Sequence, residues 1–317
     1  MDTLIGDGTG HMVRAFGYRT NGGPEVQEFL DLDMPSPMPG ELLVEVRAAG
    51  VNPVDWKIRS GMFGAANESD LPAVLGSEVS GVVREVGQDV DGFSVGDEVF
   101  GRVSPGSGGY AEHTLVPASD AAKKPTQLSF TDAATLAVAA STAYDGVQQL
   151  GLVEGQTLLI NGVSGGVGVA AAQIARDFGI NVIGTASEDK RAFIEALGVT
   201  LVPYGEGVRE RIRALMPDGV DAIFDLAGGA SLGAVADLLT DRSTLISAGD
   251  PGTAERLGGR MIERGGTPDV LAIVGAMAAD GKLDPHVEDI RPFDEAAEAL
   301  AAVETGHARG KVVIQVS

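Results

Sequence analysis

The chain of 317 residues contains no cysteine. Without thiols there is no disulfide, no thiolate-bound zinc, no iron–sulfur cluster and no cysteine nucleophile. Basic residues are scarce as well, since 23 Lys and Arg residues stand against 45 Asp and Glu residues and give a formal net charge of -22. That charge opposes non-specific binding to nucleic acid or anionic lipid, so we expect a small-molecule ligand and no nucleic-acid partner.

Long apolar runs are also missing. No stretch approaches the roughly 18 apolar residues of a membrane span, and the N-terminus has no basic segment followed by an apolar one. We therefore expect no membrane span and a cytoplasmic location. The first strand-like run begins after Met12, so we leave residues 1–11 out of the fold.

The chain contains two kinds of secondary-structure pattern, and the change from one to the other occurs near residue 128. Before it, short β-type runs alternate with Gly- and Pro-containing turns, as in an all-β or barrel-like module. After it, an Ala-rich helical stretch over 131–150 precedes alternating strands and helices, a pattern that predicts βαβ crossovers and a parallel sheet. The expected strands are 13–17, 41–48, 79–86, 98–103 and 112–116, then 157–161, 181–185, 200–202, 222–226 and 244–247; the expected helices of the second part are 166–178, 188–197, 207–216 and 231–239.

The remaining segments are harder to assign to either part. The short apolar run 259–264 fits a sheet edge, which pairs with a second copy in a dimer or is covered within the chain; both alternatives stay open, and a homodimer is our expectation. The tail predicts a helix over 268–280, a strand over 287–291, a helix over 293–305 and a strand over 311–316.

The most informative local motif is the segment TLLINGVSGGVG, residues 157–168. It reads as a buried strand, a tight turn and a helix start, where backbone N–H groups and the helix dipole favour a pyrophosphate. Of the dinucleotide pattern G-x-G-x-x-G, only the last two glycines are met, by Gly165 and Gly168. Gly165 would permit close approach of a pyrophosphate, and Gly168 close packing of helix on strand.

The same letters also satisfy G-x-S-x-G, the nucleophile elbow of serine hydrolases. Ser164, Asp225 and His286 even follow the order of the α/β-hydrolase triad. No HGGG-type oxyanion segment precedes the serine, however, and an elbow does not predict the further glycines. The dinucleotide interpretation is therefore preferred.

The choice between NAD and NADP rests on the end of the second strand of this unit. An NAD site carries an acidic residue there, but the chain has Ala186 and Ser187, followed by Lys190 and Arg191. Hydroxyl and cationic groups bind a 2′-phosphate, so NADP(H) is predicted. In the alternative interpretation the two cations form the polar face of a surface helix, with acidic neighbours as partners.

Five segments, in order and in register, resemble the zinc-free quinone oxidoreductase branch of the medium-chain dehydrogenase/reductase superfamily. They are AGVNPVDWKIRSG (49–61), LGSEVSGVV (75–83), GDEV (96–99), the glycine loop and GHARGKVV (306–313). The resemblance implies an α/β protein with a GroES-like β-rich catalytic domain over 12–127 and a Rossmann doubly wound cofactor domain over 128–266. It also implies that the tail, 267–317, returns to the catalytic domain.

The resemblance further implies roles for individual residues. Asn52 would lie near the nicotinamide or the substrate carbonyl, and Thr142 would hold the carboxamide at the start of the cofactor domain. The other cofactor-binding positions that it suggests are Ser164, Gly165, Gly166, Val167 and Gly168 at the pyrophosphate, Ser187, Lys190, Arg191 and Tyr204 at the 2′-phosphate or adenosine, Asp225, Leu226, Ala227, Ser247, Ala248 and Gly249 at strand ends, and Lys311 in the tail.

Departures from the zinc-containing relatives concern the metal and the proton donor. Zinc ligands of the superfamily would fall at Asn52, Ser77 and about Val138, none of which is a zinc ligand type, so no metal is expected. Without a Lewis acid, conjugated acceptors such as quinones and α,β-unsaturated carbonyls are favoured, because they delocalise the charge of an incoming hydride. Asp55 and Lys57 are candidate catalytic proton donors, and solvent is the alternative.

Overall fold

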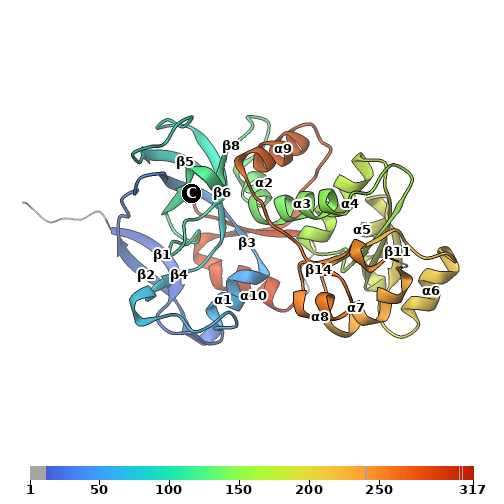
Figure 1. Cartoon of the computed structure of the whole chain (residues 1–317). Coiled ribbons are helices and arrows are strands. Elements are labelled where there is room, and N and C mark those ends of the chain that lie inside the picture. The colour runs from blue at the N-terminus through green and yellow to red at the C-terminus, as the bar shows by residue number, and fades with distance from the viewer. Residues whose placement is uncertain (1–11, 240, 307, 309) are drawn as a thin grey trace, which may run out of the picture.

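The computed structural model describes residues 12–239, 241–306, 308 and 310–317; residues 1–11, together with His307 and Arg309 of the tail motif, lie outside the described residues. The expected fold class is confirmed, because a β-rich part lies beside a part built on a parallel sheet (Figure 1). None of the described helices is long and apolar enough to cross a membrane.

The β-rich part holds two sheets. In the smaller one, the order is β2 (Gln27–Asp33), β1 (Met12–Tyr18), β4 (Ala73–Val74). In the larger one, the order is β15 (Val287–Pro292), β16 (Lys311–Gln315), β3 (Glu41–Val51), β5 (Glu78–Val86), β6 (Glu98–Arg102), β8 (Ala121–Lys123), and β7 (His113–Pro117) also pairs with β3. Alternating apolar residues of these strands bury Leu42, Val44 and Val83 in one core, as period-2 patterning requires.

The tail completes this larger sheet. β16 pairs antiparallel with β3, with Val313 opposite Gly50, and β15 pairs parallel with β16. The tail helix α10 (Ala296–Glu304) contributes the fully buried Ala296, Ala299 and Leu300 to the same core. Strands from both ends of the chain therefore lie side by side, while the domain boundaries at 127/128 and 266/267 stay predictions.

The second part is a six-stranded sheet in which every pair of neighbours is parallel. Its order is β11 (Thr200–Pro203), β10 (Asn181–Ala186), β9 (Thr157–Asn161), β12 (Ala222–Asp225), β13 (Leu245–Ser247), β14 (Arg260–Met261). The helices of this part are α4 (Gly166–Asp177), α5 (Arg191–Ala196), α6 (Val208–Leu215), α7 (Gly229–Val235), α8 (Pro251–Arg256) and α9 (Pro268–Ala279). β9 is buried at every residue, which explains its continuous apolar run.

The Ala-rich stretch 131–150 connects the two parts and is helical, as predicted. It consists of α2 (Phe130–Ala133), a π-helical turn over Leu136–Ala140 and α3 (Ser141–Gln149). Small side chains let this segment pack into the core of the cofactor domain, where Ala137 and Ala140 are buried. Single π turns inside helical segments often mark functional sites, and this one faces the cluster described next.

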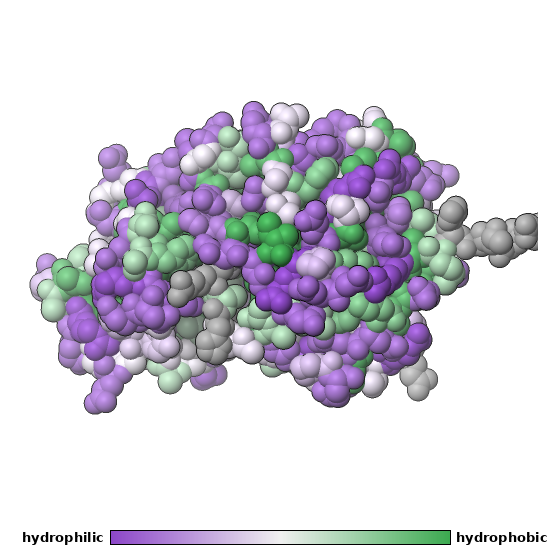
Figure 2. Space-filling model, turned by 180° about the vertical axis from the view of Figure 1, so that it is seen from behind, coloured by the Kyte–Doolittle hydropathy of each residue, from purple (hydrophilic) through white to green (hydrophobic). Residues whose placement is uncertain are grey.

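The surface is dominated by polar groups, in keeping with the acidic composition. Seen from behind, hydrophobic residues occur in small groups between hydrophilic ones (Figure 2). The larger exposed apolar side chains include Phe63 and Met62, which follow α1 (Pro53–Arg59) in the catalytic part.

Candidate active site

The first element of the site is the start of α1, which the sequence Asn-Pro-Val-Asp builds by capping. Asn52 is the N-cap, Pro53 fits the first helical position because its missing N–H is not needed there, and Asp55 stands at the third. The Asp55 carboxylate accepts the backbone N–H of Asn52 at 2.8 Å. This half of a capping box fixes the direction in which the Asn52 side chain leaves the backbone.

Asp55 is the centre of a buried polar group. Besides the N–H of Asn52, it accepts hydrogen bonds from the hydroxyls of Ser77 and Tyr110, each at 2.8 Å. Burial raises the pKa of Asp55 to about 6, although these hydrogen bonds oppose the shift. Position 76 requires glycine for two reasons: a φ of 95° is unfavourable for other residues, and the nearby Tyr110 ring leaves no room for a Cβ.

The Asn52 amide is held by two charged groups of opposite sign. Lys311, at the start of β16, donates its ammonium to Asn52 Oδ1 at 2.6 Å, and Asn52 Nδ2 donates to Glu78 Oε1 at 2.8 Å. Lys311 and Glu78 also pair directly at 2.9 Å. Because a cation faces the amide oxygen and an anion faces the amide nitrogen, the orientation of the amide group is fixed.

Glu78 extends the cluster into the second part of the chain. Its other oxygen, Oε2, accepts the backbone N–H of Val138 at 2.8 Å, and Val138 belongs to the π-helical turn. Thr142 follows on the first turn of α3 and is buried. Sequence reasoning assigned no role to Glu78 or to Tyr110. The sequence signal that indicates Glu78 is a carboxylate at the start of an apolar, buried strand, where an unpaired charge is rare.

The three positions where zinc ligands would fall come together at this cluster. Asn52 Nδ2 lies 3.4 Å from Ser77 Oγ, and Val138 is bonded to Glu78, the residue next to Ser77. An amide, a hydroxyl and an aliphatic side chain do not form a zinc site, which needs imidazole, thiolate or carboxylate ligands. Of the two neighbouring carboxylates, Glu78 is paired with Lys311, and Asp55 accepts hydrogen bonds from Asn52, Ser77 and Tyr110. In the described part of the chain, no group of three His, Asp or Glu residues is arranged to hold a metal.

Lys57 lies outside this hydrogen-bonded cluster. Its ammonium is 5.7 Å from the centre of the Trp56 ring, and the side chain is half-buried. Of the two candidate proton donors, only Asp55 is connected to Asn52 through hydrogen bonds, directly and through Ser77.

The glycine loop between β9 and α4 fits a dinucleotide. A Cβ on Gly168 would lie 2.5 Å from the carbonyl oxygen of Val163, so this glycine permits the helix to pack on the strand. A Cβ on Gly165 would meet nothing within 4 Å, so the exposed Gly165 backbone borders open space at the N-terminus of α4. That is the environment in which N–H groups and the helix dipole hold a pyrophosphate.

The same loop touches the tail and therefore the Asn52 cluster. Gly165 bridges to Gly310, and a Cβ on Gly166 would lie 2.7 Å from Cδ of Lys311. A cofactor whose pyrophosphate lies on the loop thus has the Asn52 cluster within reach of its nicotinamide end. Val167 and Ser164 are both half-buried in the loop.

The two cations predicted for the 2′-phosphate have different surroundings. Arg191 is bound by Glu188 at 2.6 Å and by Glu195 at 2.6 Å, and hydrogen bonds with these carboxylates raise its pKa. Lys190 instead turns toward the glycine loop, with Nζ 3.3 Å from Ser164 Oγ. Ser187, the N-cap of this turn, is half-buried. Arg191 therefore forms ion pairs on the helix surface, as in the alternative interpretation, and Lys190 faces the loop; binding of a 2′-phosphate by either residue stays a prediction.

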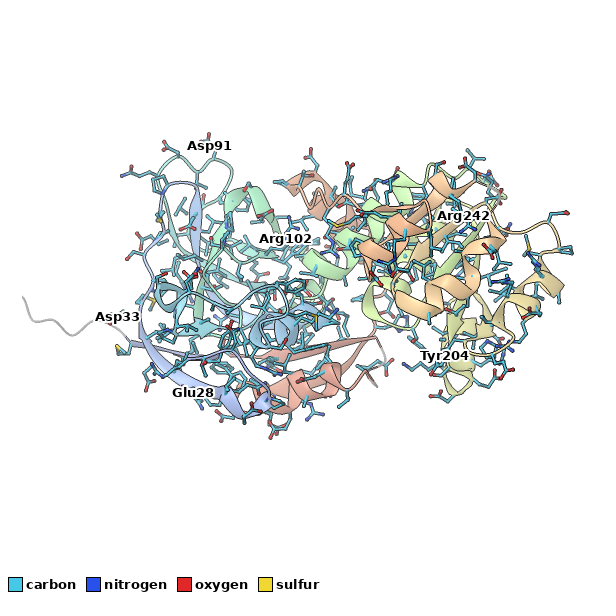
Figure 3. All side chains as sticks on the ribbon, turned by 60° about the horizontal axis from the view of Figure 1, so that its bottom comes forward. Glu28, Asp33, Asp91, Arg102, Tyr204 and Arg242 are labelled. Carbon is cyan, nitrogen blue, oxygen red and sulfur yellow. The ribbon has the colours of Figure 1, made fainter. Side chains whose placement is uncertain are left out.

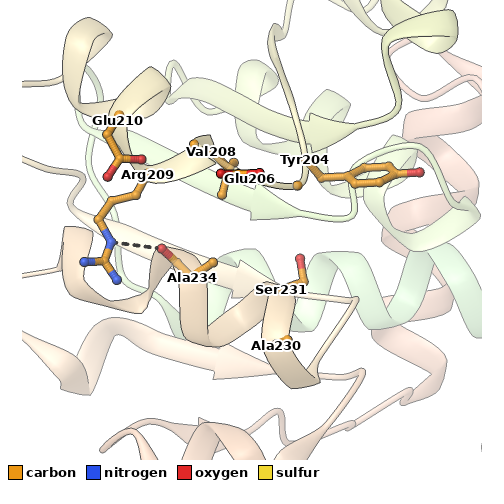
Figure 4. A pocket seen from close by; sticks show the side chains of 10 residues that line it. Tyr204, Glu206, Val208, Arg209, Glu210, Ala230, Ser231 and Ala234 are labelled. Carbon is orange, nitrogen blue, oxygen red and sulfur yellow. Dashed lines mark hydrogen bonds between the residues drawn. The ribbon is translucent and has the colours of Figure 1, made fainter.

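Tyr204 lines a cleft of about 490 Å³ beside the ends of β10 and β11. Its backbone N–H bonds to Ala186, and its side chain is 61% exposed. Figure 4 shows Tyr204 above and Ser231 below the cleft, and to their left Arg209 donates a hydrogen bond to the carbonyl oxygen of Ala234 at 3.2 Å. An aromatic ring and a concave surface at these strand ends fit an adenosine group.

Asp225 acts on the backbone around it. Its buried carboxylate accepts hydrogen bonds from Asn161 at 2.7 Å, from Ser247 at 2.6 Å and from the backbone N–H of Gly228 at 3.0 Å. Ser247 in turn accepts the N–H of Gly249. These bonds shape the turns that follow β12 and β13, which carry the other predicted strand-end positions, Leu226, Ala227 and Ala248.

The hydrolase triad is not assembled. The recorded partners of Asp225 do not include a histidine, and the ring of His286 instead stacks edge-on against Phe193, 5.2 Å between centroids. Ser164 accepts from Lys190. Within the described residues, the three groups therefore serve separate parts of the structure.

Two family models match the chain. Residues 38–126 match the alcohol dehydrogenase GroES-like domain, and residues 197–314 match the zinc-binding dehydrogenase domain. These matches cover both parts of the fold, including the segments that carry Asn52, Glu78 and Lys311. The second description names zinc, whereas the three positions where ligands would fall hold Asn52, Ser77 and Val138.

Relatives extend over nearly the whole chain. A quinone oxidoreductase of Homo sapiens is 34% identical over 77% of this chain and 74% of its own length. An NADPH-dependent alkenal/one oxidoreductase of Arabidopsis thaliana chloroplasts is 32% identical over 95% of this chain and 79% of its own. The solved structure of a quinone oxidoreductase from Coxiella burnetii has a TM-score of 0.88 and 30% identity, covering 97% of this chain and all (100%) of that one.

Fold, site and relatives agree. The family models cover the segments around Asn52 and the tail strand, and the relatives that match 95% and 97% of the chain extend over the part between them. The chain therefore belongs to the medium-chain dehydrogenase/reductase superfamily and is a quinone oxidoreductase-like enzyme that uses a nicotinamide cofactor.

Proposed function

We propose that the enzyme uses NADPH, without zinc, to reduce a quinone or an α,β-unsaturated carbonyl compound. The observation that supports this most is the cluster at the zinc-ligand positions, where the local cation is the ammonium of Lys311, already bound to Glu78 and Asn52. No strong Lewis acid is then present to polarise an isolated ketone. A conjugated acceptor does not need one, because it spreads the charge of the incoming hydride over several atoms.

NADPH, when bound, supplies the hydride; the chain supplies orientation and a proton. The glycine loop would hold the pyrophosphate, Thr142 would contact the carboxamide, and the fixed amide of Asn52 would form the wall against which the nicotinamide and acceptor are placed. The acceptor gains two electrons with the hydride and one proton. The group best connected to deliver that proton is the half-buried Ser77 hydroxyl, 2.8 Å from Asp55. Ser77 would pass its proton to the acceptor and take one from protonated Asp55, which is left as the carboxylate.

The preference for NADPH over NADH is assigned to Lys190 and Ser187, with Tyr204 beside the adenosine. Lys190 has no carboxylate partner among the described residues, whereas Arg191 has two. We expect Lys190→Ala to raise the Kd for NADPH about tenfold and to leave that for NADH within twofold, since a charge-assisted bond to phosphate contributes about 1.5–3 kcal/mol.

The matched control is Arg191→Ala, because its charge is already satisfied within the helix. It should change both dissociation constants by less than about twofold. Titrations followed by nucleotide fluorescence measure the Kd for NADPH and the Kd for NADH in each of the two variants. Equal losses for NADPH and NADH in Lys190→Ala would refute the assignment of the 2′-phosphate to this lysine.

Turnover separates the proposed enzyme from two alternatives, an enoyl-thioester reductase of a biosynthetic pathway and a low-turnover NADPH-binding sensor. Loss of NADPH absorbance is followed with a panel of quinones, enones and enoyl thioesters. Activity with quinones or simple enones is expected. Activity confined to thioesters would favour the first alternative, and saturation by NADPH with no acceptor consumed would favour the second.

We also propose a homodimer formed through β14, with a cytoplasmic location as the composition predicts. β14 is the edge of the parallel sheet, and Met261 on it is 52% exposed. An unpaired edge can continue its sheet into a second copy. Light scattering after size-exclusion chromatography should give twice the chain mass of 32.4 kDa, and Met261→Pro should shift it to the monomer mass.

A further inference from the structure

Two arginines from different parts of the chain meet beside the proposed active site. Arg102 ends β6, and its strand partner in β5 is Glu78. Directly opposed residues of antiparallel strands project from the same face of a sheet, so Arg102 leaves the sheet on the side of Glu78. Phe100, two residues earlier on that face, packs in the core of the cofactor domain. Figure 3 accordingly shows Arg102 where the two halves of the molecule meet.

Arg264 reaches the same place from the cofactor domain. It follows β14, and the two residues after it, Gly265 and Gly266, donate their N–H groups to Asp145 at 2.9 and 3.2 Å. Asp145 lies one turn beyond Thr142 on α3. This tether keeps the segment beside the residue that would contact the nicotinamide carboxamide.

The Arg264 side chain lies at the end of β13, where the following residues are predicted to border the cofactor. Its Nη2 is 3.5 Å from the carbonyl oxygen of Ala248, which follows β13. On the other side, Arg102 Nη2 is 3.3 Å from the carbonyl oxygen of Gly266. Arg102 thus lies next to the segment that carries Arg264, and the surrounding protein atoms and, to a smaller extent, the charge of Arg102 lower the pKa of Arg264.

Negative charge does not balance this pair. Arg102 is bound by Asp120 at 2.8 Å, but no ion pair joins Arg264 to a carboxylate in the described residues. Asp145 uses its carboxylate on backbone N–H groups instead. Arg264 is exposed to solvent, so its guanidinium is accessible to a ligand, on a molecule whose formal net charge is -22. An accessible cation without a carboxylate partner among the described residues favours an anionic ligand.

We infer that Arg264, supported by Arg102, binds a carboxylate or phosphate group on the acceptor, at a distance from its conjugated carbonyl. The inference rests on the proposed function, because it names the chemical class of acceptor for the same site. A planar guanidinium binds two oxygens of a carboxylate or phosphate at once, which orients the acceptor as well as attracting it. The pair also offsets the general repulsion between an acidic protein and an anionic substrate.

The test compares acceptors that differ in charge. One pair is 6-oxohept-4-enoate and its neutral methyl ester; a second pair is crotonoyl-coenzyme A and crotonoyl-N-acetylcysteamine, which differ in the phosphorylated carrier. Wild-type protein is compared with Arg264→Gln and with a matched control, Arg213→Gln, on an exposed residue of α6. In Arg264→Gln we expect kcat/KM to fall about tenfold for the anionic member of at least one pair and less than twofold for neutral members.

The result also tells which anion is bound. A loss confined to the enone carboxylate identifies a carboxylate acceptor, and a loss confined to coenzyme A identifies a phosphorylated one. Equal losses for charged and neutral members, or the same losses in Arg213→Gln, would overturn the inference. The wild-type preference for the anionic member should also decrease with added salt, since it is electrostatic.

Failure of the inference is distinguishable from failure of the proposed function. If no acceptor, charged or neutral, is reduced, the proposed function is wrong. Calorimetric titration of the NADP⁺-loaded protein with 6-oxohept-4-enoate and with crotonoyl-coenzyme A then tests the anion site without turnover. Binding that Arg264→Gln weakens about tenfold supports the site, and binding that is absent or unchanged in the variant refutes it.

Discussion

The buried pair of Lys311 and Glu78 gives the sharpest test of the site. Their side chains are 5% and 0% exposed, and Lys311→Met would leave the Glu78 carboxylate buried without its counter-ion. Removing one partner of a buried ion pair destabilises a protein by about 3–5 kcal/mol. We expect the Lys311→Met variant to lose free energy of unfolding in that range.

Adding Glu78→Gln to Lys311→Met should restore much of the loss, because the double variant buries no net charge. The hydrogen bonds from Asn52 Nδ2 and the Val138 N–H can then be accepted by a neutral amide oxygen. We expect the double variant to lie within about 2 kcal/mol of the wild type, so that Glu78→Gln recovers at least about 1 kcal/mol of the loss caused by Lys311→Met. Urea unfolding, followed by far-UV circular dichroism and by the fluorescence of Trp56, measures each value.

The matched control is Glu304→Gln, which unpairs another buried cation, Arg59, from a carboxylate at 2.9 Å. It should lower stability without changing kcat/KM of the folded enzyme, since Glu304 does not touch Asn52 or Glu78. Lys311→Met should lower kcat/KM as well, because the Asn52 amide loses the group that fixes its orientation. If the single and double variants lose equal free energy, the argument for a desolvated pair is refuted.

Two further predictions concern the proton route and the glycine loop. Burial raises the pKa of Asp55 to about 6, so the protonated form is present below that pH and kcat should fall as the pH rises through it. Ser77→Ala should reduce kcat at least tenfold and remove this pH dependence. If Ser77→Ala leaves the pH profile unchanged, the proton route through Ser77 is excluded. Gly168→Ala should lower the free energy of unfolding by about 1–3 kcal/mol, because the new Cβ would meet the Val163 backbone. Gly165→Ala should change the free energy of unfolding by less than about 0.5 kcal/mol but raise the Kd for NADPH. Equal unfolding midpoints in urea for the two variants would contradict these different roles.

Much of the fold followed from the sequence because its signals are local. Strand 157–161 coincides with β9, and the predicted helix 166–178 is one residue longer than α4, since buried parallel strands and Gly-bounded helices carry their pattern within a few residues. The elements that were not predicted have weaker local patterns. β2 alternates polar and apolar residues with one of its seven residues buried, and α1 is a short helix recognisable only by its Asn-Pro-Val-Asp cap.

The site was less predictable because its contacts join distant parts of the chain. Lys311 and Glu78 are 233 residues apart, and Tyr110 lies 55 residues from Asp55. Composition and spacing identify each segment but not which side chains meet. The sequence also did not distinguish Lys190 from Arg191, because the neighbouring carboxylates select their partner only after the helix has formed.

The cluster around Asn52 shows how a site in this superfamily can be held without a metal. A bound cation would tie together the segments that carry positions 52, 77 and 138; in this chain the Lys311 ammonium and the Glu78 carboxylate join the same segments through five hydrogen bonds to Asn52, Val51, Val138 and each other. Because the ammonium is saturated by these partners, it supports the geometry but has little capacity to polarise an acceptor. Under the proposed function, structural support and electrophilic activation, which one metal ion can combine, are separated, and the activation comes from the conjugation of the substrate itself.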